Sequence, residues 1–171
     1  MPAASPNPSA NMMMGFGRPN LWGIGQTDPG MDTYSFAYNR TGVVFYNGTT
    51  TGGYAGFVKD DVVMVAIDTT NGFAYFGVNG TWGLNGDPTS GATGTGGFNY
   101  DSLVTNVAIG DLLIPAFSTG NAGNIIQLNF GGYTEVSIAS GNTDENGYGN
   151  FEYAPPTGYY ALCSKNLAEF G

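Results

Sequence analysis

The sequence predicts an all-β fold, and three observations support this prediction. Several short apolar runs are rich in β-branched and aromatic residues, which favour strands. Glycine accounts for 29 of the 171 residues and follows no collagen-like period, as expected for many turns between short strands. No stretch keeps the apolar spacing of an amphipathic helix.

The clearest element is a β-hairpin. Val62–Ile67 and Phe73–Val78 are apolar runs of strand length, separated by a short polar loop. The loop ends in Asn71-Gly72, a pair that readily takes the positive φ angles of tight turns. Asp68 at its start is expected to accept hydrogen bonds from backbone amides of the turn, which is a structural role.

Other segments can be assigned in chain order. Residues 1–11 contain three prolines and are expected to form an extended arm ahead of one domain over residues 12–171. Two more predicted strands are Tyr34–Tyr38 and Val43–Tyr46. Thr49–Gly53 and Thr81–Gly97 are expected loops, and the length of the second points to a functional or a mobile segment.

Charge narrows the possible partners. The net charge is −9, and the four basic residues are far apart in the sequence. A nucleic-acid site needs a basic stripe to displace counterions, so no nucleic-acid partner is expected. No apolar run approaches the length of a membrane span, so no membrane insertion is expected either.

The composition argues against catalysis and metal binding. The chain has no histidine, which removes Ser-His-Asp and Cys-His catalysis and histidine metal ligands. Asp60 and Asp61 are adjacent, so on a strand they point to opposite faces and cannot act as an acid/base pair. Asn142–Gly147 resembles half of a calcium loop, but a solvated polar loop explains it better. No catalytic residue, metal or cofactor is expected, and Cys163 is expected to be a small buried residue near the final strand.

Two stretches resemble a known family. The hairpin, with its Asp-Asp-Val start and its Asn-Gly turns, resembles the central hairpin of SPRY domains. Phe151–Leu167 resembles the closing segment of SPRY-like domains in bacteriophage proteins. Three further stretches look like SPRY strands, namely Met12–Gly17, Leu112–Ser118 and Ile125–Gly131. Pro115 needs an edge or bulge position in such a strand.

The resemblance implies a concanavalin-like antiparallel β-sandwich of SPRY jelly-roll type. It also implies a non-enzymatic structural or binding module of a phage virion, either a capsid decoration or a tail-associated surface protein. Its partners would be other virion proteins, in a homo-oligomer or a lattice, or a host-surface glycan. The alternatives are a glycan hydrolase or lyase on the same type of sandwich and a cellular SPRY adaptor that binds peptides.

SPRY domains normally have further strands before the stretch that Met12–Gly17 resembles. The sandwich is therefore expected to lack its first strands, or to be completed by a strand from a partner.

Aromatic residues in predicted loops are the candidates for recognition, because such side chains anchor both protein and sugar contacts. The surface near Trp82 is the favoured contact site. The candidate residues are Trp22, Trp82, Tyr100, Tyr133 and Tyr148.

Overall fold

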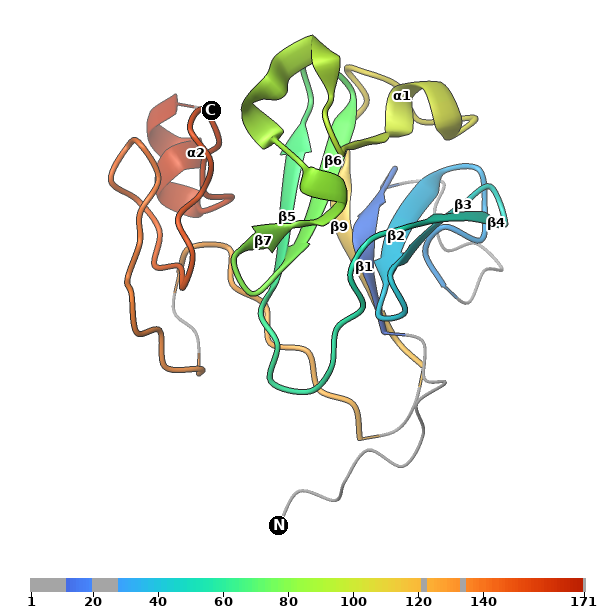
Figure 1. The fold of residues 1–171 in the computed structure, drawn as a ribbon. Helices are drawn as coiled ribbons and strands as arrows, with labels where there is room; N and C mark the ends of the chain where they lie inside the picture. Colours follow the sequence, from blue (N-terminus) through green and yellow to red (C-terminus); the bar gives the residue numbers. More distant parts are fainter. Residues whose placement is uncertain (1–11, 20–27, 121–122, 133–134, 171) are drawn as a thin grey trace. The chain divides into compact units, whose positions relative to one another are not determined.

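The computed structural model describes residues 12–19, 28–120, 123–132 and 135–170. The chain forms two compact units, Met1–Ile125 and Ile126–Gly171. The larger unit contains two antiparallel sheets, which confirms the predicted all-β sandwich (Figure 1).

Sheet A has five strands in the order β4-β3-β2-β1-β9. Their bounds are β1 Met12–Gly17, β2 Ser35–Asn39, β3 Val43–Tyr46, β4 Thr49–Gly52 and β9 Ile114–Thr119. Four of these strands confirm predicted ones to within two residues at each end. Pro115 lies in β9, a terminal strand of the sheet, as its missing N–H requires.

Strand β4 corrects the prediction of a loop over Thr49–Gly53. Asn47 and Gly48 take φ angles of 50° and 69°, so the chain turns tightly after β3. The threonine-rich segment that follows then pairs with β3 in register, with Thr51 opposite Val44. Threonine is compatible with both a strand and a loop, and this segment forms a strand because the turn places it beside β3.

Sheet B is built on the predicted hairpin, which is confirmed. Strand β5 (Val63–Asp68) pairs with β6 (Phe73–Val78), and β6 also pairs with two short strands on its other side. These are β7 (Thr81–Trp82) and β8 (Phe98–Asn99). The intervening chain forms two 3-10 helices, η1 (Gly83–Asn85) and η2 (Pro88–Thr93), so the long predicted loop has regular structure.

The core between the sheets is mainly aromatic. Phe36 stacks on Tyr100 at a centroid distance of 5.4 Å, and Tyr38 stacks on Phe76 at 5.1 Å. Tyr100 begins the short helix α1 (Tyr100–Leu103), which places its ring in this cluster. Burial raises the pKa of Tyr38, Tyr54 and Tyr100 to about 12, with nearby charged or phenolic groups adding to the effect.

Two predictions for the chain from Ile125 onward are wrong. Ile125–Gly131 forms no strand, and Ile125 and Leu128 are exposed, because the segment has no ladder partner among the described residues. Cys163 is only partly buried, and helix α2 (Ser164–Phe170) follows it instead of a strand.

Candidate partner-binding surface

The outer face of sheet B carries large aromatic side chains. Along β6, Ala74 and Phe76 point into the core, so the alternation of a strand directs Phe73 and Tyr75 to the opposite face. Tyr75 is nevertheless only 1% exposed. Another part of the same unit must therefore cover this face.

The segment between β7 and β8 provides that cover. The Tyr75 hydroxyl oxygen lies 3.5 Å from Ser90 Oγ, and a Cβ at Gly97 would lie only 2.9 Å from the Tyr75 ring. Gly94 approaches the Phe73 ring more closely still and has a φ of 61°. Glycine is needed at both positions because the backbone packs directly on the two rings.

Hydrogen bonds brace this segment internally. The Asp87 carboxylate accepts bonds from Thr89 N at 2.9 Å and from Thr89 Oγ1 at 2.6 Å. These two bonds lower the pKa of Asp87 below its usual value. Ser90 Oγ donates to Asp87 O at 2.7 Å and accepts from Thr95 N at 2.9 Å. The segment between β7 and β8, residues 83–97, is thus ordered on the outer face of sheet B, and we call it the platform.

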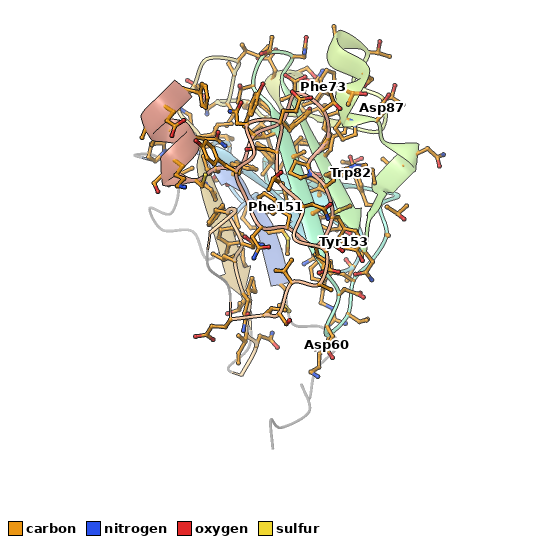
Figure 2. All side chains as sticks on the ribbon, turned by 90° about the vertical axis from the view of Figure 1, so that its left-hand side faces the viewer. Asp60, Phe73, Trp82, Asp87, Phe151 and Tyr153 are labelled. Atoms are coloured by element: carbon orange, nitrogen blue, oxygen red, sulfur yellow. The ribbon has the colours of Figure 1, made fainter. Side chains whose placement is uncertain are left out.

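Trp82 lies directly before this platform. It is opposite Gly77 in the β6–β7 register, and a Cβ at Gly77 would lie 3.0 Å from Trp82 Cε3 and 2.6 Å from Met64 Cε. The indole therefore packs over a position without a side chain, beside a methionine. Trp82 is only partly buried. Figure 2 looks onto this side of sheet B and labels Phe73, Trp82 and Asp87.

The turn after Trp82 holds an unusual backbone. Leu84 and Asn85 have φ angles of 55° and 51°, in the left-handed region that bulky residues avoid. A bond of 2.9 Å from Gly86 N to Gly83 O closes the turn, and Leu84 is 45% exposed. Strained turns of this kind tend to occur at binding sites. We call Met64, Trp82 and Gly83–Asn85 the Trp82 surface.

Leu84 did not stand out in the sequence. The stretch Leu-Asn-Gly predicts a turn, but not that leucine itself takes the left-handed conformation. Only the backbone angles reveal it.

The other predicted aromatic sites have different positions. Tyr100 is 1% exposed and stacks in the core, so the expectation of an exposed loop residue is wrong. Tyr148 is in the smaller unit, where its hydroxyl donates to Glu169 at 2.7 Å and Lys165 lies 5.3 Å from its ring centroid. Trp22 and Tyr133 lie outside the described residues.

The carboxylates considered for catalysis hold turns together. Asp68 accepts bonds of 2.9 Å from the amides of Thr70 and Asn71, as predicted. Asp61 accepts bonds of 2.7 Å from Val58 N and from Asn79 Nδ2, and these bonds lower its pKa.

Asp144 corrects the expectation of a solvated polar loop, because it is only 6% exposed. Its carboxylate accepts bonds from Asn146 N, Tyr148 N, Ala161 N and Asn166 Nδ2 at 2.6–3.0 Å. Burial favours the neutral acid, but the bonds outweigh it and the pKa of Asp144 falls below its usual value. This carboxylate fastens the loop to the segment before α2.

The described residues contain neither a membrane-spanning helix nor a metal-ligating cluster. None of the described helices is long and apolar enough to cross a membrane. Among the same residues, no three His, Cys, Asp or Glu side chains gather closely enough to hold a metal ion.

The chain matches a known protein family. A family model described as SPRY domain matches residues 7–133, more than half of the chain. The matched range includes both sheets and the Trp82 surface. Phe151–Leu167 lies beyond the matched range. No curated protein matches the chain.

Proposed function

The chain belongs to the SPRY domain family, and from this we propose that it is a binding module that holds a protein partner on the Trp82 surface. The observation that carries the proposal is the partly buried Trp82 beside the exposed Leu84, in a turn held in a strained conformation on a braced platform. Rigid aromatic anchors of this kind dominate protein interfaces, because little conformational freedom is lost on binding.

The proposed role is not catalytic. SPRY domains are typically non-enzymatic binding modules. Structural roles are supported for three carboxylates, because each accepts hydrogen bonds from groups of its own unit: Asp61, Asp68 and Asp144.

We place the module in a bacteriophage virion, as a capsid decoration or a tail-associated protein. The likeness of Phe151–Leu167 to phage SPRY-like proteins supports this placement. The partners would be other virion proteins, and the chain would be a homo-oligomer or bound to the particle lattice. A host-surface glycan is the second candidate ligand, favoured by the partial exposure of the Trp82 indole, on which a sugar ring could stack.

Rebinding to stripped particles tests the surface. The purified wild-type chain should co-sediment with virions of the encoding phage from which the chain has been removed. Trp82→Ala and Leu84→Ser should each weaken this binding at least tenfold, as expected for an interface anchor. Tyr160→Ala, which removes an aromatic side chain that is 55% exposed in the smaller unit, is the matched control and should bind normally. Normal binding by Trp82→Ala would refute the assignment of the surface.

Two further measurements test the placement. Mass spectrometry of purified virions should detect the chain, and its absence would argue for a cellular adaptor. Light scattering with circular dichroism should show an oligomer of the isolated chain. Trp82-dependent binding to a glycan array, without rebinding to particles, would favour the glycan.

A further inference from the structure

The outer edge of β5 is an open sheet edge without the residues that usually prevent further strand pairing. Among the described residues β5 pairs with β6 alone, so it is a terminal strand of sheet B. Terminal strands normally carry proline, charge or irregular backbone that discourages further pairing. In sheet A, β9 contains Pro115, and β4 is a short polar strand of three threonines and a glycine. Val63–Ile67 contains none of these protections.

The free hydrogen-bonding groups of this edge can be identified. Asn79 N donates to Val62 O at 2.9 Å, so the backbone groups of Val62 point toward β6. Because these groups alternate along an antiparallel strand, Val63, Val65 and Ile67 direct their N–H and C=O groups away from β6. Each of the three residues thus offers one donor and one acceptor at the edge.

The core beneath this edge is incompletely covered. Val63 and Ile67 pack against the core cluster, and the alternation places Val65 on the same inner face. Val65 is nevertheless 37% exposed. A further strand on this edge would place alternate side chains over Val65 while satisfying the backbone groups.

The charges around β5 indicate what kind of strand fits. Asp60 and Asp61 precede the strand and Asp68 ends it, with Lys59 the one nearby basic residue in that sequence. A second copy paired antiparallel through Val65 would bring Asp61 and Asp68 of the two chains close together, which is unfavourable. A strand with basic residues at both ends would be attracted instead.

We propose that the edge of β5 receives an extended segment of a partner protein, with apolar side chains on one face and a basic residue at each end. The segment adds a strand to sheet B through Val63, Val65 and Ile67. This proposal does not depend on the Trp82 surface, which uses the outer face of the sheet.

The test uses a short peptide of alternating valine and threonine with lysine at each end. Amide exchange measured by NMR should be fast for Val65 in the free protein and at least tenfold slower when the peptide is bound. Val65→Pro removes the free N–H without removing a β5–β6 bond, and should weaken peptide binding at least tenfold. Val65→Ile keeps the N–H and an apolar β-branched side chain, and should bind within about threefold of wild type.

A second set of binding measurements changes the peptide and not the protein, so it does not depend on the folding of a variant. N-methylation of the valines in the peptide should abolish binding, and replacing its lysines with glutamates should weaken binding at least tenfold at low salt. Four results would overturn the proposal: slow Val65 exchange in the free protein, equal binding of the glutamate peptide, unchanged binding by folded Val65→Pro, or a dimer that Val65→Pro dissolves.

Discussion

Gly77 of β6 lies directly opposite Trp82 of β7, and the indole occupies the space that a side chain at position 77 would need. A Cβ there would also lie 2.7 Å from the backbone oxygen of Thr81, which cannot swing aside as a side chain can. The position of Trp82 on the surface therefore depends on a glycine in the neighbouring strand.

Gly77→Ala should move Trp82 and destabilise the domain by about 1–3 kcal/mol, the usual cost of overpacking. Urea unfolding measures the stability, and tryptophan fluorescence reports on the indole. Gly132→Ala is the control, because among the described residues no atom beyond its chain neighbours lies within 4 Å of an ideal Cβ at this position, and its effect should stay within about 0.5 kcal/mol. Equal effects of the two substitutions would contradict this packing.

Tyr100 should contribute to stability as a core residue. Tyr100→Ala removes a ring stacked on Phe36 and should cost about 3–5 kcal/mol of unfolding free energy. Tyr100→Phe loses only a long bond of 3.4 Å to Asp68 O and should cost less than about 1 kcal/mol. Denaturant titration of both variants measures these free energies of unfolding. An unchanged stability of Tyr100→Ala would contradict the core position and make Tyr100 a candidate for surface recognition again.

Alkaline pH should destabilise the sandwich. Burial raises the pKa of Tyr38, Tyr54 and Tyr100 from 10.0 to about 12, so the folded state holds these protons more tightly than the unfolded state. The stabilisation is complete below pH 10 and should be lost as the pH rises toward about 12. Melting temperature across this range should fall together with the rise of tyrosinate absorbance. Ionisation of all 11 tyrosines near pH 10 without loss of structure would contradict the burial.

Acid should loosen the smaller unit through Asp144. Its pKa is lowered from 3.8 in the folded state, so its stabilisation is present above that pH and is lost as the pH falls through the lower folded value. Asp144→Asn should cost about 1–3 kcal/mol at pH 7, because the amide cannot accept from all four donors. Amide exchange of Ala161 should be faster in this variant at pH 7, and should match wild type below both pKa values.

Asp87 should order the platform without supporting the whole domain. Asp87→Ala removes the two Thr89 bonds, so amide exchange at Thr89 should accelerate while the melting temperature changes little. Asp60→Asn is the matched control, since this exposed aspartate is paired only with its neighbour Lys59 in the described contacts and asparagine tolerates the φ of 71° at this position. An unchanged Thr89 exchange rate in Asp87→Ala would mean that packing on Phe73 and Tyr75 suffices to order the segment.

Sequence patterns succeeded where the structure is local. The hairpin around Asn71-Gly72 was predictable because both strands and the turn are contiguous, and Asp68 bonds the turn amides as its position indicates. Strand β4 was missed because its threonines suit either state and only the Asn47-Gly48 turn brings them to β3. Ile125–Gly131 was wrongly assigned because its likeness to a SPRY strand shows only that the segment could pair, not that a partner strand lies beside it.

The sequence by itself determined the all-β class, the central hairpin and the resemblance to SPRY domains, because strand propensity, turn residues and short motifs are properties of neighbours along the chain. The tertiary structure decided which aromatic residues are available for recognition. Tyr100 is buried because Phe36, far away in the sequence, stacks on it. Trp82 is only partly buried because it lies on the outer face of sheet B, opposite Gly77, which has no side chain. Exposure depends on such packing, which no local pattern specifies.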